Sequence, residues 1–285
     1  MGVTDCHIHI NPLWEMHPGA RALIDTHPGA AGFEKLLKNP PAFLKLLDAA
    51  GLERAVLVNY VAPEVIGYTE KANEFVRDFV RVDPDRLIAV GSVLPTRPKP
   101  GEEVRRLVLK YGLRGIKLHP PHQLFAPNAY VDGRLDGLRE IYGACEELGV
   151  PVIVHTGTSI FPGARNRFGQ PLLVEDVAID FPRLTLVLAH GGRPLWMDEA
   201  VFLTRRFSNV YLETSSVPPS KLLEYFPALE KIQDRVVYGS DWPGPGVRDL
   251  GAHLRAVRAL SLTPETLEKI LEKNPLKVFP RRAPV

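Results

Sequence analysis

Cysteine is scarce in this sequence, which has only Cys6 and Cys145 among its 285 residues. Two thiols cannot build the disulfide framework of a small secreted protein, so we expect a reduced, cytoplasmic setting. No apolar run is long enough to cross a bilayer, and we expect no membrane association. We also expect no secretory leader, because a motif of chemical interest begins at Asp5.

The sequence also lacks an excess of charge of either sign. Its 35 basic and 33 acidic residues give a formal net charge of +2, and like charges nowhere form a long block. Nucleic-acid binding requires concentrated positive charge, so we expect a small-molecule substrate and no nucleic-acid partner. Hydrophobic residues make up 45% of the chain, which is enough for a large core. Composition leaves homo-oligomer formation open.

Short apolar runs alternate with longer amphipathic stretches along the chain. The apolar runs are rich in Val, Ile and Leu, as is typical of parallel strands buried on both faces. They predict eight strands, at Val3–Ile10, Arg54–Tyr60, Leu87–Leu94, Gly115–His119, Val150–His155, Leu184–His190, Val210–Thr214 and Val236–Asp241. The amphipathic stretches predict helices at Pro41–Ala50, Glu70–Val80, Glu102–Tyr111, Arg134–Leu148, Leu173–Phe181, Met197–Phe207, Ser220–Leu229, Asp249–Leu260 and Pro264–Glu272.

This alternation predicts an α/β protein built as a single (β/α)8 TIM barrel, with one domain over residues 1–285. A doubly wound open sheet would produce the same alternation and stays the alternative. The segment Asn11–Asn39, rich in Pro, Gly and His, is expected to be a long loop after the first strand.

Histidine is concentrated where the predicted strands end. Five of the nine histidines lie there, namely His7, His9, His119, His155 and His190. Asp241 ends the last strand, and in a barrel such residues converge on one face. Side chains alternate along a strand, so His7 and His9 share a face while Cys6 is expected to face the helices. Imidazoles together with a carboxylate are typical ligands of zinc and similar divalent metals.

Each of these residues alone has a simpler explanation, because polar side chains are common where a strand meets a loop. The whole set is more informative than its members, since each follows a buried apolar run. Asp5 shares the parity of His7 and lies deeper, where it would orient the histidines. Glu213, at the end of the seventh predicted strand, would either support the histidines from behind or contact substrate.

Five short segments resemble motifs of the amidohydrolase superfamily. They are Asp5-Cys6-His7-Ile8-His9, Lys117-Leu118-His119-Pro120, His155-Thr156-Gly157, Ala189-His190-Gly191-Gly192 and Gly239-Ser240-Asp241-Trp242-Pro243. More narrowly, the set resembles the amidohydrolase-related branch (amidohydrolase 2), which includes aminocarboxymuconate-semialdehyde decarboxylase and resorcylate decarboxylases. The resemblance extends from Asp5 to Asn274-Pro275 and is specific for superfamily and fold, but says little about substrate.

The resemblance implies a divalent metal, most commonly zinc, at about one ion per chain. Its ligands would be His7, His9, His155 and Asp241. His190 would lie beside the metal-bound water or the substrate, and would either hydrogen-bond the water or polarise the scissile bond. Asp241 would take the proton of that water and pass it to the leaving group.

Lys117 lies on the fourth predicted strand, where binuclear members of the superfamily carry a carboxylated lysine that bridges two metals. Two alternatives follow. If Lys117 is carboxylated, a second ion is bound and His190 is a further candidate ligand. Otherwise Lys117 is a cation that pairs with Asp241 or with a substrate carboxylate. The decarboxylase branch generally lacks this lysine as a ligand.

Several other residues are candidates for substrate binding. His119 is expected to enter the barrel mouth. Trp14 and Trp242 each follow a strand that bears proposed ligands, and would form an apolar wall for a cyclic substrate unless they only cover the loops. Arg193 would clamp a substrate carboxylate unless it is solvated.

Together these features predict a metal-dependent hydrolase that uses metal-activated water on an amide, ester or lactone bond of a small, cyclic or carboxylated substrate. The alternative is a metal-dependent, non-oxidative decarboxylase of an aromatic or unsaturated carboxylic acid, which is a lyase. The absence of a basic patch disfavours nucleic-acid phosphoesters as substrates. A barrel that binds a ligand without turning it over is disfavoured because unpaired buried ionisable groups are costly.

Overall fold

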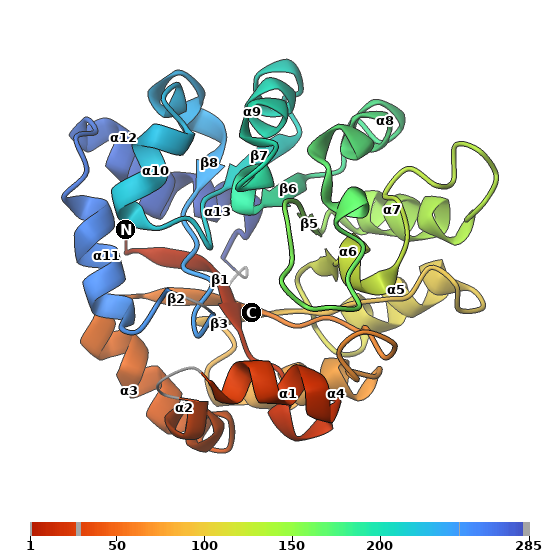
Figure 1. Ribbon diagram of the computed structural model, residues 1–285, viewed down its shortest axis with the longest axis horizontal. Coiled ribbons are helices and arrows are strands. Elements are labelled where there is room, and N and C mark those ends of the chain that lie inside the picture. Colours follow the sequence, from red (N-terminus) through yellow and green to blue (C-terminus); the bar gives the residue numbers. More distant parts are fainter. Residues whose placement is uncertain (1, 27–29, 245, 282–285) are drawn as a thin grey trace.

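The computed structural model describes residues 2–26, 30–244 and 246–281. Its strands are β1 (Thr4–His9), β2 (Arg54–Val58), β3 (Leu87–Val90), β4 (Ile116–Leu118), β5 (Val152–His155), β6 (Leu186–Ala189), β7 (Val210–Glu213) and β8 (Val236–Val237). All neighbouring strands within a sheet are parallel. The helices form a ring around them (Figure 1).

The helices follow the strands in order. They are α1 (Pro18–Asp25), α2 (Ala30–Leu37), α3 (Pro40–Ala50), α4 (Lys71–Phe79), α5 (Pro100–Leu109), α6 (Pro120–Gln123), α7 (Gly137–Leu148), α8 (Glu175–Asp180), α9 (Met197–Arg206), α10 (Leu222–Tyr225), α11 (Leu250–Arg258), α12 (Pro264–Glu268) and α13 (Asn274–Val278). Among the residues described, no helix has both the length and the apolar composition needed to cross a membrane.

Two backbone junctions close the sheet into a barrel. The regular ladders form two groups, β1–β2–β3 and β4 to β8 in order. A parallel bridge between Gly91 and Ile116 joins β3 to β4, and another between Ile8 and Trp242 joins β1 to the segment after β8. The predicted (β/α)8 barrel is therefore confirmed, and the open sheet is excluded because both edges are paired.

Most strands are shorter than predicted, and His119, His190 and Asp241 lie just beyond their strands. The predicted strand Val236–Asp241 contains a ladder of only Val236–Val237. Asp241 has a φ of 68° and His190 a φ of 67°, which is the left-handed region that extended strands cannot contain. The chain therefore leaves the sheet at these positions and turns into the loops at the barrel mouth.

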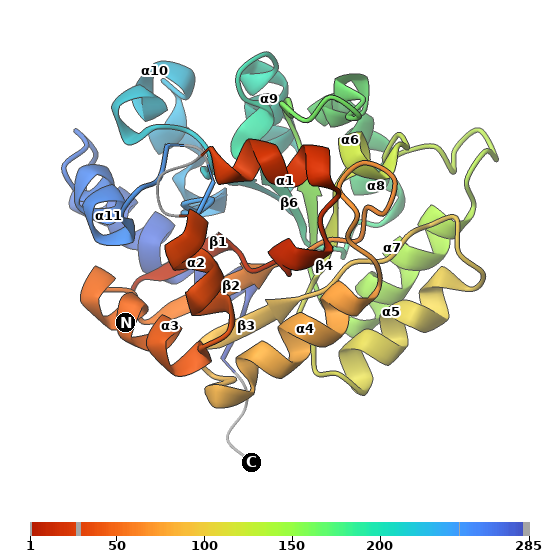
Figure 2. The ribbon, with the colours of Figure 1, turned by 60° about the horizontal axis from the view of Figure 1, so that its bottom comes forward.

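The segment Asn11–Asn39 is largely helical, so the prediction of a long loop was wrong. It contains a short 3-10 turn at Leu13–Glu15, then α1 and α2. Both helices lie at the front of the barrel in Figure 2. Their burial explains the error, because Leu13, Phe33 and Leu37 pack into the main apolar core and tertiary contacts outweigh the local Pro and Gly signals.

The apolar core has two layers. Outward-facing strand residues such as Leu57, Leu118 and Leu188 pack against the helices. Inward-facing residues such as Val56 and Ile153 form a separate cluster inside the barrel. Each strand therefore buries both faces, as its near-continuous apolar sequence predicts.

Cys6 lies in the inner cluster, which contradicts the expectation that it faces the helices. The register between β1 and β2 shifts, because the three-residue step from Asp5 to Ile8 lies opposite the two-residue step from Ala55 to Leu57. One extra residue on β1 interrupts the alternation of side chains. The alternation rule therefore holds for His7 and His9 but not for the residue before them.

We predict that Leu212→Ala lowers the free energy of unfolding by about 2–5 kcal/mol, because it opens a cavity between the barrel and its helices. Leu212 is fully buried on β7. As a control, Leu109→Ala on α5 removes a side chain that is 69% exposed and should change stability by about 0.5 kcal/mol or less. Denaturant unfolding followed by circular dichroism measures both, and equal losses would contradict the two-layer core.

Candidate metal centre

The carboxyl ends of the strands open into a cavity of about 400 Å³. Six of the ionisable residues identified from the sequence line it, namely His9, His119, His155, His190, Arg193 and Asp241. His7 lies just beneath them and is fully buried. Residues separated by more than two hundred positions therefore meet at one mouth of the barrel, as expected for this fold.

Asp241 lies beside the two histidines of β1. Its Oδ1 atom is 3.1 Å from His9 Nε2 and 3.5 Å from His7 Nε2. Burial alone would raise the pKa of Asp241, but the hydrogen bond with His9 and the nearby imidazoles outweigh this and hold its pKa below the usual range. Asp241 is therefore a carboxylate at neutral pH, as a metal ligand or a proton acceptor must be.

A compact group of potential ligand atoms surrounds this carboxylate. One ligand atom from each of His7, His190 and Asp241 lies within 4.8 Å of the others. His7 Nδ1 is 2.8 Å from Glu213 Oε2, and both side chains are fully buried. The other ring nitrogen of His7, Nε2, is buried and makes no hydrogen bond to any described residue. A buried nitrogen without a partner is the arrangement that a metal ion would satisfy.

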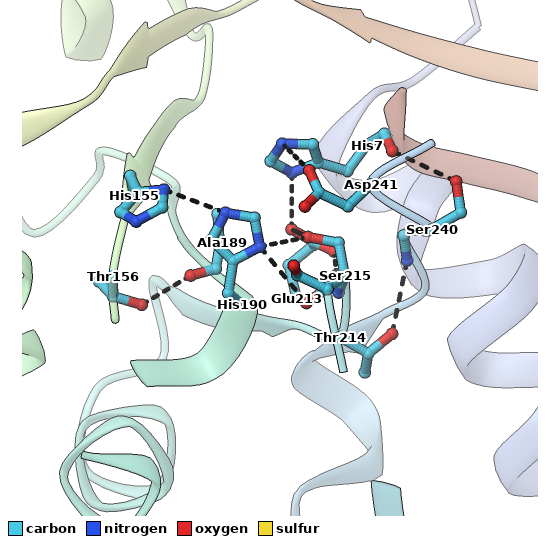
Figure 3. Close-up of polar contacts among 12 residues, drawn as sticks. His7, His155, Thr156, Ala189, His190, Glu213, Thr214, Ser215, Ser240 and Asp241 are labelled. Atoms are coloured by element: carbon cyan, nitrogen blue, oxygen red, sulfur yellow. Dashed lines mark hydrogen bonds and ion pairs between the residues drawn. The ribbon is translucent and has the colours of Figure 1, made fainter. Parts of the chain in front are cut away.

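His155 approaches the group through His190 (Figure 3). His155 Nδ1 is 3.1 Å from His190 Nε2, and His190 Nδ1 is 2.7 Å from Ser215 Oγ. Burial, followed by the charges of neighbouring groups, lowers the pKa of both imidazoles well below the ordinary value. Both rings are therefore neutral. His155 Nε2 is buried and, within the described chain, has no hydrogen-bond partner.

Lys117 is fully buried at the inner face of β4, and its Nζ atom has no hydrogen-bond partner among the residues described. Burial lowers the pKa of Lys117 to about 8, although Glu213 and Asp241 oppose the shift. Its amine therefore exists partly in the neutral form near neutral pH.

A stack of rings forms one wall of the cavity. His119 lies between His122 and His155, with ring centroids 3.7 Å and 3.8 Å away respectively. His122 Nε2 is 2.6 Å from Ser159 Oγ, and its Nδ1 is 3.2 Å from the hydroxyl of Tyr60. The sequence reasoning did not identify Tyr60 or Ser159, although the position of Tyr60 at the end of a predicted strand was a usable signal.

The apolar wall comes from the segment that was expected to be a loop. Met16, Leu23 and Ile24 line the cavity, together with Phe33. The tryptophans expected there lie elsewhere. Trp242 packs edge-on against Phe33 with ring centroids 5.1 Å apart, and Trp14 is 47% exposed on the surface. Neither is among the described residues that line the cavity.

Arg193 lines the cavity and makes no ion pair with a described carboxylate. Its guanidinium donates to the carbonyl oxygen of Thr158 at 3.2 Å and to Ser216 Oγ at 2.7 Å. Its Nε atom is buried without a described partner. An oriented guanidinium at a cavity wall is suited to binding an anionic group.

The sequence model of the amidohydrolase family matches residues 4–281 of this chain. No curated protein sequence matches it. A solved structure of an uncharacterised TIM-barrel protein from Bordetella bronchiseptica has 23% identity and a TM-score of 0.77, with 98% of each chain covered.

Two further solved structures are similar to the chain. One is 5-carboxyvanillate decarboxylase from Sphingomonas paucimobilis, with 16% identity, a TM-score of 0.66 and 99% of each chain covered. The other is a candidate 2-pyrone-4,6-dicarboxylic acid hydrolase from Pseudomonas putida, with 18% identity and a TM-score of 0.65, covering 98% of this chain and 97% of that one.

At these identities the solved structures support the fold alone, and they agree with the closed barrel described above. The family match spans nearly the whole chain, from β1 to the residues after α13. It includes every strand end that contributes to the cavity. This chain belongs to the amidohydrolase family.

Proposed function

We propose that this protein is a metal-dependent hydrolase that cleaves an amide, ester or lactone bond in a small, carboxylated ring compound. The observation that carries the proposal is the pair of buried imidazole nitrogens, His7 Nε2 and His155 Nε2, that have no partner among the described residues. His7 Nε2 lies 3.5 Å from the ionised Asp241, and His155 reaches this group through His190. Neutral imidazole nitrogens and a carboxylate form the donor set that zinc prefers.

In this proposal the ligands are His7, His9, His155 and Asp241. The group of three residues whose ligand atoms lie within 4.8 Å of one another is His7, His190 and Asp241, so it includes neither His9 nor His155. We favour His155 because both nitrogens of His190 are already within hydrogen-bond distance of other groups, whereas His155 Nε2 is free of them. When bound, zinc would supply a Lewis acid that makes water acidic near neutral pH.

The protein's own residues would handle the proton and the substrate. The Asp241 carboxylate would accept a proton from the attacking water and return it to the leaving group. His190 lines the cavity beside it, and its engaged nitrogens favour holding the site in shape over exchanging protons. This structural role of His190 differs from the catalytic role that was expected from the sequence.

The cavity favours a carboxylated ring compound. Arg193 offers a guanidinium without a carboxylate partner in the described chain, and Met16, Leu23 and Ile24 offer an apolar surface nearby. His119 would contact the substrate from the stacked wall. Two of the similar solved structures are named for ring compounds that carry carboxyl groups. A 2-pyrone is itself a cyclic ester, which agrees with hydrolysis of a lactone.

The alternative function is decarboxylation of an aromatic or unsaturated carboxylic acid. This chain is similar to a solved decarboxylase structure, with 99% of each chain covered, and this similarity supports decarboxylation as the alternative reaction. The Arg193 guanidinium would hold a carboxylate of the substrate. Asp241, after taking a proton from water, would deliver it to the ring carbon that loses carbon dioxide.

We predict that the purified protein binds about one divalent ion per chain, and that His7→Ala and Asp241→Ala reduce this content at least about tenfold, because each removes a ligand. His17→Ala is the matched control, since His17 is exposed and its Nε2 lies 2.6 Å from the carbonyl oxygen of Pro63. Elemental analysis after dialysis measures the content. Full metal content in both ligand variants would overturn the assignment.

Bicarbonate separates the two alternatives for Lys117. A rise to about two ions per chain that is lost in Lys117→Met would assign a carboxylated lysine to a second metal. A constant content of about one ion would make Lys117 an unmodified cation.

We predict that the zinc-loaded protein opens lactones that carry a carboxylate, and that Arg193→Met raises KM for them by about ten- to a hundredfold, because a charged hydrogen bond is lost. The methyl ester of the same lactone is the control, since its KM should change little. Acid release measured with an indicator dye reports hydrolysis. Carbon dioxide release from aromatic acids without any ring opening would instead support the decarboxylase.

A further inference from the structure

We infer that Glu213 and Ser215 are positioning residues that determine which ring nitrogen carries the proton in the histidines of the candidate metal centre. They form a hydrogen-bonded chain that runs from β7 to β1 in one direction and to β6 and β5 in the other (Figure 3). The inference rests on the proposed function only where it assigns a use, metal binding, to the nitrogens left without protons.

This series of hydrogen bonds starts at the carboxyl group of Glu213, which is fully buried at the end of β7. Its Oε1 atom accepts from the backbone N–H of Ser215 at 2.5 Å, and its Oε2 atom accepts from the Ser215 hydroxyl at 2.8 Å. Oε2 also lies 2.8 Å from His7 Nδ1. Both Glu213 oxygens accept from Ser215, so in the remaining contact to Oε2 the His7 ring is the donor and carries its proton on Nδ1. Its Nε2 atom, 3.5 Å from Asp241 Oδ1, therefore presents a lone pair.

Ser215 passes the same constraint to His190. A serine hydroxyl has one hydrogen, and Glu213 takes it. Ser215 Oγ, 2.7 Å from His190 Nδ1, is therefore the acceptor of that contact. The carbonyl oxygen of Ser215 also lies 3.3 Å from His190 Nδ1, and a carbonyl can only accept. The short contact to the hydroxyl oxygen places the proton of His190 on Nδ1 and leaves its Nε2 bare, and the longer carbonyl contact adds only weak support.

The last step reaches His155. Because His190 Nε2 has no proton, the contact of 3.1 Å to His155 Nδ1 requires that His155 donates. The proton of His155 then lies on Nδ1, and its Nε2 atom presents a lone pair. Each of the three rings then has one nitrogen that donates, and its other nitrogen either accepts or has no partner among the described residues. A neutral imidazole has one proton, so fixing one nitrogen determines the other.

Two ring nitrogens of these three histidines lack hydrogen-bond partners in the described chain, and both are among those that the series of hydrogen bonds leaves without protons. His7 Nε2 and His155 Nε2 are buried and unpaired among the described residues, and the chain of contacts leaves both without protons. If Glu213 did not take the hydroxyl hydrogen, Ser215 could donate to His190 instead. The protons of His190 and His155 would then move to the opposite nitrogens, and a protonated His155 Nε2 cannot bind a metal.

The test is heteronuclear NMR of the metal-free, full-length protein labelled with ¹⁵N-histidine, which reports the protonated nitrogen of each ring. We expect His7, His155 and His190 to carry their protons on Nδ1. In Ser215→Ala the His7 signal should stay unchanged, while His155 and His190 should become mixtures of both tautomers. Ser215→Thr keeps the hydroxyl and should restore the original pattern. Glu213→Gln should disturb all three rings.

Zinc affinity provides a second readout on the same proteins. Loss of a partner that orients a ligand from behind costs about ten- to a hundredfold in metal affinity. We expect that loss in Ser215→Ala and Glu213→Gln, and near-normal affinity in Ser215→Thr. Thermal unfolding of each variant checks that the fold is retained. An unchanged midpoint together with an altered tautomer separates positioning from a purely structural role.

The failure of this inference differs from the failure of the proposed function. If the metal-free protein carries the His155 proton on Nε2, or if Ser215→Ala leaves every tautomer unchanged, the inference is overturned whether or not zinc binds. If the tautomers are as expected but the protein binds no divalent ion, the inference stands and the proposed metal-dependent function fails.

Discussion

Burial of ionisable side chains at one end of a closed barrel is the constraint from which the properties of this site follow. Closure brings strand ends from the whole chain to one mouth and removes water from the deepest of them. His7, Lys117 and Glu213 are fully buried as a result. Burial disfavours charge on the imidazoles and leaves them neutral, with defined donor and acceptor nitrogens. Asp241 remains a carboxylate there because the hydrogen bond with His9 and the nearby imidazoles outweigh burial and hold its pKa below the usual range.

The backbone at the barrel mouth is adapted to the same purpose. His190 and Asp241 both adopt left-handed conformations, which cost non-glycine residues of the order of 1–3 kcal/mol. The surrounding barrel holds these conformations in place. The backbone N–H of Asp241 donates to the carbonyl of His7 at 2.8 Å, so the sheet continues to β1 just where the side chain turns toward the cavity. The two catalytic candidates, His190 and Asp241, thus lie just after the ends of their strands, where the backbone is strained.

The cavity combines groups of different origin. The barrel supplies rigid histidines and a carboxylate, whereas α1 and α2 supply an apolar wall that was not expected from their sequence. Arg193, after β6, adds a cation. This division is physically reasonable for an enzyme family with many substrates, because the barrel can hold the reactive groups still while the loops and added helices set the shape and charge of the pocket.

The sequence by itself determined an alternating α/β chain with eight strands and the positions of the histidines and Asp241, because buried parallel strands and the polar residues that end them leave strong local patterns. Closure into a barrel was decided by the tertiary structure, in which both sheet edges are paired. The sequence did not determine which face of β1 Cys6 occupies. A single extra residue in β1 turns this side chain into the barrel, and no local signal marks that bulge. The sequence placed Trp14 and Trp242 at the mouth, whereas packing against other aromatic rings holds Trp242 in the apolar core. Only the tertiary structure revealed the contacts through Ser215, because hydrogen bonds between strands depend on angles and distances that spacing along the chain does not encode.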